Sequence, residues 1–304
     1  AGPGRRTPDG PAGMTGPATT PATAGPAWPN RLPRVVATDL DGTLLRSDGS
    51  ISARTRRALA ATEQAGTSVL FVTARPPRWV TPLADAVGAH GVVIAGNGAF
   101  VVDLERGEVA STGCFSSAGL LPLVADLRAQ FPDAGFALER RAGMTVEASF
   151  TTPHGEDHDA ASVVTSLEDV PDLDEDPTGK LLVVAPRGAG GPDFIAAVQA
   201  VVADRGHVAY SGVARLAEIS APGTTKAAGL ASWCGARGID AEDVWAFGDM
   251  PNDLPMLLWA GTSFGVEGGH PDVVALTTHT CPANDADGVA RVLEHALAGG
   301  RGTR

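Results

Sequence analysis

Short apolar runs alternate with amphipathic stretches over the first part of the chain that carries a regular pattern. The runs at residues 35–38, 68–72 and 92–95 are continuous and rich in Val, which predicts buried strands. Between them, residues 52–66 and 79–87 place apolar side chains at helical spacing. Because strand, helix, strand, helix and strand follow one another with short connections, we predict a parallel α/β sheet.

The pattern changes after this sheet. A hairpin is predicted over residues 100–115, and strands and helices then follow in mixed order up to residue 210. The polar, acidic stretch at 152–177 interrupts them, and we expect it to be irregular except for one short helix near 160–167. These features predict a separate α+β module that is inserted between two halves of the first domain.

The first domain is predicted to resume near residue 214. Residues 216–219 are expected to rejoin its sheet, strands follow at 244–247 and 262–266, and an amphipathic helix covers 288–297. The predicted division of the chain is a tail at 1–32, a core at 33–113 and 214–304, and an inserted α+β cap at 114–213.

The N-terminal segment differs in composition from the rest of the chain. Eight Pro and six Gly stand among its first 33 residues, so it has too few apolar side chains to offset its ordering entropy. We expect a disordered tail without the apolar run of a secretory signal. Nowhere does an apolar run approach the about 20 residues of a membrane-spanning helix.

Charge and cysteine content narrow the possible functions. The 304-residue chain has a formal net charge of −12, and such an acidic surface repels nucleic-acid phosphates and anionic lipids. We therefore expect neither nucleic acid nor a membrane as a partner. The cysteines Cys114, Cys234 and Cys281 are scattered and lack metal-ligand spacing, which fits a reducing compartment and predicts a cytoplasmic protein.

Acidic side chains directly follow two of the predicted strands. Asp39 and Asp41 come after the first strand, and Asp249 and Asp253 come after the strand at 244–247. Ligands of parallel sheets bind at the carboxyl ends of the strands, so we expect these carboxylates to converge. Close carboxylates repel each other unless a cation joins them, and Mg²⁺ is commonly held by one or two carboxylates with water and substrate phosphate.

Each candidate also has a structural explanation when it is taken alone. An Asp-x-Asp pair is common in turns, Asp253 is a suitable helix N-cap, and a lysine at a helix start, such as Lys226, is usually solvated. The conjunction favours a site, because every member stands at a strand end or a helix start. In chain order the set is Asp39, Asp41, Thr73, Lys226, Asp249, Asn252 and Asp253.

This set resembles the motifs of the haloacid dehalogenase-like hydrolases. Residues 39–45 resemble the first motif, 72–76 the second, Lys226 the third and 248–253 the fourth. Asn97-Gly98-Ala99 and the large insertion are similar to those of the Cof-type subgroup with a C2B cap. The resemblance implies a Rossmann-like core with an inserted α+β cap.

The resemblance extends from Arg34 to about Leu297 and has two departures. Ala74 replaces the Gly that is usual in the second motif of the subgroup, and Glu267-Gly268-Gly269 lacks the Asn usually found before the His-Pro stretch. Neither departure removes a catalytic group, but both bear on how a substrate fits.

The resemblance implies a phosphatase that works through an aspartyl phosphate. Asp39 would be the nucleophile and Asp41 the general acid and base. The Thr73 hydroxyl would donate to a phosphoryl oxygen, and Lys226 would balance the developing charge. The implied cofactor is Mg²⁺, with Asp39, Asp41 through its backbone carbonyl, Asp249 and Asp253 around it. The implied phosphate-binding positions are Leu40, Gly42, Thr43, Arg75, Asn97 and Asn252.

The expected substrate is a small phosphate monoester, such as a sugar phosphate or a phosphorylated cofactor, because a cap encloses the leaving group. One alternative is a hexose phosphomutase, in which the aspartyl phosphate returns its phosphoryl group to sugar. A second is a non-catalytic sugar-phosphate binder, which would gain nothing from Asp39 as a nucleophile. We expect a monomer or a homodimer.

Overall fold

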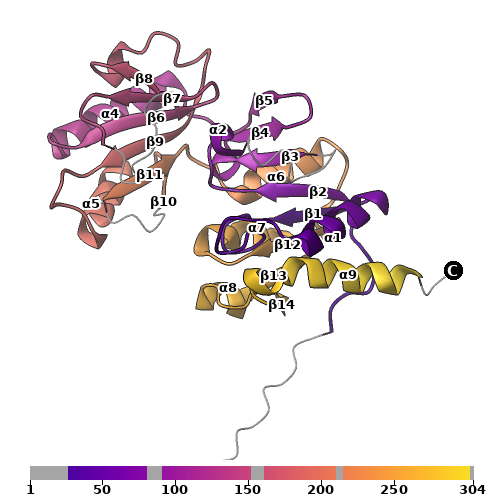
Figure 1. The fold of residues 1–304 in the computed structure, drawn as a ribbon. Helices are drawn as coiled ribbons and strands as arrows, with labels where there is room; N and C mark the ends of the chain where they lie inside the picture. The colour runs from indigo at the N-terminus through magenta and orange to yellow at the C-terminus, as the bar shows by residue number, and fades with distance from the viewer. Residues whose placement is uncertain (1–26, 81–90, 152–160, 210–214, 302–304) are drawn as a thin grey trace, which may run out of the picture.

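The structure is a computed structural model that describes residues 27–80, 91–151, 161–209 and 215–301. These residues form two sheets, each with its own helices, and the two units lie beside each other (Figure 1). The parallel sheet with a second, inserted sheet confirms the predicted fold class. None of the helices in the described part of the chain has the length and apolar character that crossing a membrane requires.

The core sheet has eight strands in the order β14-β13-β12-β1-β2-β3-β4-β5. Neighbours from β14 to β3 are parallel, and β4 and β5 extend the sheet as the predicted antiparallel hairpin. All residues of the central strand β1 are buried, which explains its continuous apolar sequence. The bounds are β1 Val35–Thr38, β2 Ser68–Val72, β3 Val92–Ala95, β4 Phe100–Asp103, β5 Glu108–Ser111, β12 Val244–Gly248, β13 Thr262–Val266 and β14 His279–Cys281.

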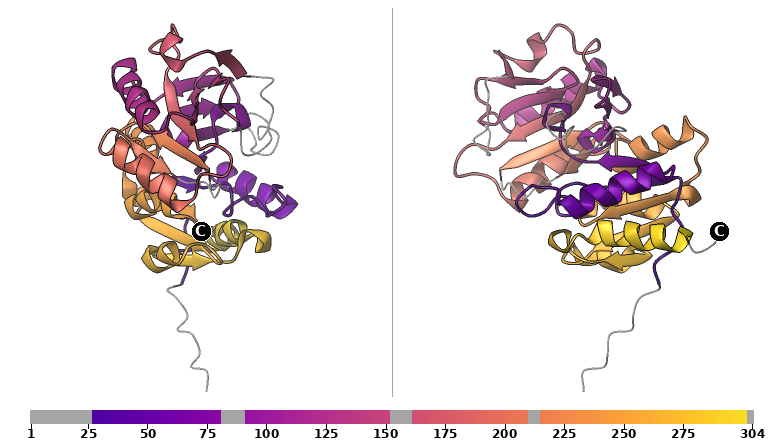
Figure 2. Two further views of the ribbon diagram at one scale, coloured as in Figure 1. Left: turned by 90° about the vertical axis from the view of Figure 1, so that its left-hand side faces the viewer. Right: turned by 45° about the vertical axis from the view of Figure 1, so that its right-hand side comes forward.

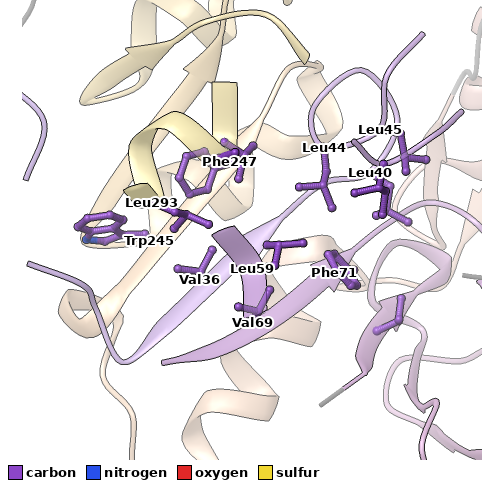
Figure 3. Packing of buried hydrophobic residues seen from close by; sticks show 14 of the residues in the cluster. Val36, Leu40, Leu44, Leu45, Leu59, Val69, Phe71, Trp245, Phe247 and Leu293 are labelled. Atoms are coloured by element: carbon purple, nitrogen blue, oxygen red, sulfur yellow. The ribbon is translucent and has the colours of Figure 1, made fainter. Parts of the chain in front are cut away.

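Helices cover both faces of the core sheet. Helices α1 and α9 lie side by side on one face (Figure 2, right), where Val36 packs against Leu59 and Leu293 (Figure 3). Val35 and Ala37 point to the other face and pack under α6 and α7, as the alternation of side chains along a strand requires. The bounds are α1 Ala53–Gln64, α2 Pro77–Val80, α6 Lys226–Gly235, α7 Leu254–Trp259, α8 Pro271–Leu276 and α9 Gly288–Arg301, with 3₁₀ turns η2 Gly96–Gly98, η5 Ala241–Asp243, η6 Pro251–Asp253 and η7 Asn284–Ala286.

The inserted unit, defined as described residues between 115 and 220, contains a six-stranded sheet in the order β10-β11-β9-β6-β7-β8. Helices α4 and α5 pack on one face, where Phe136, Leu181 and Ile219 are fully buried. The opposite face carries a smaller apolar cluster that includes Ala137 and Leu182. The bounds are α4 Ser117–Gln130, β6 Gly135–Arg140, β7 Met144–Glu147, β8 Ala161–Val164, η4 Leu167–Asp169, β9 Thr178–Val184, α5 Pro192–Val202, β10 His207–Ala209 and β11 Leu216–Ser220.

Two predicted elements are corrected by the structure. Residues 216–219 were expected to rejoin the core sheet, but β11 pairs with β9 and β10 of the inserted unit, so this unit extends to Ser220. A short apolar run fits either sheet, and here Glu218 is placed beside Lys180. Residues 161–164 form strand β8 along β7 instead of the expected helix.

The predicted tail is also shorter than expected, because residues 27–32 belong to the packed structure. Trp28 packs against the core cluster with Leu32, its indole N–H donates to the Thr280 carbonyl at 2.9 Å, and its ring meets His295 edge-on. A single large aromatic residue thus holds the segment to β14. The rest of the predicted tail, and most of the helix predicted at 79–87, lie outside the described residues.

Candidate active site

Two neighbouring parallel strands bring the acidic residues together. Thr38 of β1 lies in register with Phe247 of β12, and the Asp39 amide continues the ladder by donating to the Phe247 carbonyl at 3.0 Å. Asp39 and Asp249 therefore leave the sheet at the same edge. Residues more than 200 positions apart in the sequence meet here because their strands are adjacent.

Three of the four carboxylates that the sequence predicts to converge, those of Asp39, Asp249 and Asp253, form one buried acidic cluster, and the Asp41 side chain lies outside it. Each of the three offers a carboxylate oxygen, and these oxygens all lie within 4.8 Å of one another. Burial raises the pKa of Asp39 above its ordinary value, although Lys226 opposes the shift, and burial likewise raises the pKa of Asp249 to about 6. Desolvated carboxylates at this spacing favour a cation between them.

Lys226 supplies part of the missing positive charge. Its Nζ donates to Asp39 Oδ1 at 2.5 Å and to Asp253 Oδ1 at 2.6 Å, and its side chain is almost fully buried. Desolvation lowers the pKa of Lys226, but the Asp253 and Asp39 carboxylates together raise it above its ordinary value. One ammonium among three carboxylates leaves an excess of negative charge, and a divalent cation that takes oxygen ligands fits both this charge and the donor set.

Asp253 holds the loop that carries Asp249. Its Oδ2 accepts hydrogen bonds from the amides of Asp249 and Met250, both at 3.0 Å, while its Oδ1 binds Lys226. Both oxygens are thus engaged by the chain itself. Asp253 therefore fixes the position of the loop that carries Asp249 and of the Lys226 ammonium.

The turn after Asp39 requires glycine. Gly42 has a φ of +82°, and a Cβ at this position would lie 2.3 Å from Asp249 Oδ2. Beside it, the Thr43 hydroxyl donates to Asp249 Oδ1 at 2.6 Å. The backbone amides of Thr43 and Leu44 donate to the Leu40 carbonyl. The turn is therefore held by its own backbone hydrogen bonds and by the hydrogen bond from Thr43 to Asp249.

Asp41 and Arg75 form a separate pair at the edge of the site. Arg75 Nε donates to Asp41 Oδ2 at 2.8 Å and its Nη2 donates to Asp41 Oδ1 at 2.5 Å. The Asp41 side chain is 58% exposed, in contrast to the buried cluster. The acid–base candidate thus faces solvent, and a guanidinium fixes its orientation.

Three further predicted residues, Thr73, Asn97 and Asn252, differ in burial and in hydrogen bonding. Thr73 is buried at the end of β2, and its hydroxyl accepts from the Arg75 amide at 3.1 Å. Asn97 has a φ of 58°, and its backbone N–H donates to the Thr73 carbonyl at 3.0 Å. Its side-chain Oδ1 is buried and has no hydrogen-bond partner within the described structure. Asn252 is exposed in η6.

Sequence reasoning missed a charged group on the inserted unit that contacts the loop after Thr73. Lys180 Nζ donates to the Ala74 carbonyl at 2.8 Å, and Arg78 Nη2 lies 2.6 Å from Glu139 Oε1. The available signal was a lysine that begins the apolar run of β9, in a strand whose residues are all buried.

The sequence and the fold are similar to known proteins. A family model described as haloacid dehalogenase-like hydrolase matches residues 36–293. The 5-amino-6-(5-phospho-D-ribitylamino)uracil phosphatase YitU of Bacillus subtilis is 29% identical over 86% of this chain and 97% of its own. The pyridoxal phosphate phosphatase YbhA of Escherichia coli is 25% identical over 86% and 97%.

A solved structure shares the fold. The haloacid dehalogenase-like hydrolase from Bacteroides thetaiotaomicron superposes with a TM-score of 0.71 at 24% identity, over 86% of this chain and 98% of that one. The match spans both the core sheet and the inserted unit. At this level of identity the likeness shows the fold alone.

Proposed function

The chain belongs to the haloacid dehalogenase-like hydrolase family, and from that premise we propose that it is a Mg²⁺-dependent phosphatase of small phosphate monoesters, sugar phosphates or phosphorylated cofactors. The observation that carries the proposal is the convergence of Asp39, Asp249 and Asp253 around the Lys226 ammonium. A nucleophile, a countercharge and a set of oxygen donors are thereby gathered at one strand edge.

Asp39 is the nucleophile in this proposal. Its carboxylate oxygen attacks phosphorus in line, the bond to the leaving oxygen breaks, and an aspartyl phosphate forms. Lys226, which contacts Asp39 Oδ1, reduces the repulsion between the carboxylate and the incoming phosphate. Water then hydrolyses the aspartyl phosphate and restores the carboxylate.

The metal ligands we propose are the Asp39 and Asp249 carboxylates and the Asp41 backbone carbonyl. Mg²⁺ bound there would neutralise charge on the phosphoryl oxygens. Asp253 acts on this set through the loop amides it holds, because Lys226 and those amides engage both of its oxygens. Thr43 and Gly42 keep the Asp249 carboxylate in place, the first by a hydrogen bond and the second by its missing side chain.

Asp41 is the general acid and base. It gives a proton to the leaving oxygen and then takes one from the attacking water. Arg75 fixes its carboxyl group by two hydrogen bonds, so we assign Arg75 an orienting role beside the phosphate contact that the sequence suggests. The Thr73 hydroxyl is proposed to donate to a phosphoryl oxygen, with Asn252 at the open side.

The inserted unit is proposed to act as a cap that encloses the leaving group. The relatives' names support a small substrate, because they give a ribitylaminouracil phosphate and pyridoxal phosphate as substrates of those enzymes. Both are small phosphate monoesters of molecules that contain a nitrogen heterocycle, so we place this chain's substrate in the same size range. The proposed compartment is the cytoplasm, because all three cysteines are free thiols.

Phosphate release from p-nitrophenyl phosphate and from a panel of metabolite monophosphates tests the proposal. We expect turnover that needs Mg²⁺, stops on chelation and is absent in Asp39→Asn. Adding a sugar bisphosphate to a sugar monophosphate separates hydrolysis from group transfer. Dependence on the bisphosphate without phosphate release would replace the phosphatase with a phosphomutase.

A further inference from the structure

The loop after β2 is bound by the core on two sides and by the inserted unit in the middle. The Thr73 carbonyl accepts from the Asn97 amide at 3.0 Å, and the Arg75 carbonyl accepts from the Gly96 amide at 2.9 Å. The Ala74 carbonyl between them accepts from Lys180 Nζ of the inserted unit at 2.8 Å. Three successive carbonyls are thus fixed, and the middle one is held across the junction between the units.

The Lys180 side chain is held in place by burial and by an ion pair. Its side chain is only 4% exposed, and its ammonium also pairs with Glu218 of the adjacent strand β11. Forming such a buried pair costs desolvation free energy for both charged groups. Moving the Lys180 ammonium into solvent would break both its ion pair with Glu218 and its hydrogen bond to the Ala74 carbonyl.

An ion pair crosses the junction next to the hydrogen bond between Lys180 and the Ala74 carbonyl. Glu139 lies directly opposite Lys180 in the register of β6 and β9, and its carboxylate binds Arg78 of α2. Helix α2 begins at Pro77, two residues after Arg75. Both cross-junction contacts therefore reach the short segment 74–78, which follows Thr73 directly.

We propose that Lys180 is a positioning residue, which fixes the Ala74 carbonyl and thereby places the Thr73 hydroxyl and the Arg75 guanidinium when the inserted unit is seated on the core. The inference rests on the proposed phosphatase function for its kinetic consequence. Arg75 orients Asp41, so a shift of this loop moves the general acid and the phosphate-binding hydroxyl together. Misplacement of about 1 Å at such groups costs up to about 100-fold in rate.

The test compares Lys180→Met with Arg140→Met. Arg140 is a matched control, because its side chain is similarly buried and its bonds to Asp172 and Asp176 stay within the inserted unit. We expect kcat on p-nitrophenyl phosphate to fall about 10- to 100-fold in Lys180→Met with KM changed less than about threefold, and to stay near wild type in Arg140→Met. If Lys180→Met does not fold, Lys180→Met/Glu218→Gln also removes the charge of the carboxylate that pairs with Lys180.

Three results overturn the inference. An unchanged kcat in Lys180→Met makes the contact purely structural, and a raised KM with unchanged kcat makes Lys180 a substrate ligand. Amide exchange of Gly96 and Asn97 gives a readout that does not depend on turnover, since these amides bind the Arg75 and Thr73 carbonyls. We expect faster exchange in Lys180→Met than in Arg140→Met, and equal exchange would refute the inference even if the wild-type protein hydrolyses no phosphate ester.

Discussion

The Lys226 ammonium lies 2.5 Å from the Asp39 carboxylate, although 187 positions separate the two residues in the sequence. The same ammonium lies 2.6 Å from Asp253. This buried contact joins the end of β1 to the start of α6 and to the turn after β12. It is the link by which the core sheet assembles the proposed nucleophile with its countercharge.

Lys226→Met should destabilise the protein strongly. The substitution leaves the buried carboxylates of Asp39 and Asp253 without their shared cation, which costs about 3–5 kcal/mol in unfolding free energy. Urea denaturation measures the loss. Lys226→Met/Asp253→Asn should recover part of the lost unfolding free energy, because one uncompensated charge is removed. If Lys226→Met alone were as stable as the wild-type protein, the buried carboxylates would not need the Lys226 ammonium.

Asp39→Asn should abolish turnover and preserve the fold. The amide keeps the volume of the carboxyl group, and burial raises the pKa of Asp39, so a neutral side chain is tolerated there. We expect kcat to fall by more than about 1000-fold, as for removal of other covalent nucleophiles, with the melting temperature maintained. Activity within tenfold of wild type would move the nucleophile to another residue.

Gly42→Ala should disrupt the site through a contact that a matched variant lacks. Both Gly42 and Gly49 have φ near +80°, but a Cβ at 42 would meet Asp249 Oδ2 at 2.3 Å, whereas a Cβ at 49 meets nothing within 4 Å. Each alanine carries about 1 kcal/mol of backbone strain. Only Gly42→Ala should also lower kcat/KM, by about 100-fold, in a p-nitrophenyl phosphate assay. Equal activity of the two variants would show that Asp249 tolerates displacement.

The Arg54–Glu294 pair should make a small, pH-dependent contribution to stability. Arg54 on α1 hydrogen-bonds Glu294 on α9 and holds the pKa of that carboxyl below its usual range. A depressed pKa in the folded state stabilises the protein above the unfolded value of about 4.3, and this gain is lost as the pH falls through the folded pKa.

Because both side chains are more than one-third exposed, solvent screens the pair and its contribution to stability is small. Arg54→Met should therefore differ slightly from wild type in unfolding free energy near neutral pH. The difference should vanish once Glu294 is protonated in both states. A difference that persists in acid would assign the effect to packing of the Arg54 stem.

The core and its acidic cluster were accessible from the sequence because both follow local rules. Buried parallel strands such as β1 read as continuous apolar runs, and their carboxyl ends fix where Asp39 and Asp249 must point. The inserted unit was less accessible. The run at β11 fits either sheet, and its pairing with β9 and β10 is a long-range contact that no local pattern encodes.

Side-chain partners across long separations were also hidden. Nothing near Arg75 in the sequence indicates that its guanidinium binds Asp41, and nothing near Trp28 indicates that its ring seats against β14. These contacts depend on the assembled fold. Composition alone therefore overestimated the length of the N-terminal tail.

The site of phosphorylation tests the central claim most directly. The wild-type protein is mixed with p-nitrophenyl phosphate and Mg²⁺, quenched in acid within the first turnovers, and its peptides are analysed by mass spectrometry. We predict a phosphoryl group on Asp39 that is absent when Mg²⁺ is withheld. A phosphoryl group on Asp41 or elsewhere, or active turnover that leaves Asp39 unmodified at every quench time, would contradict the account.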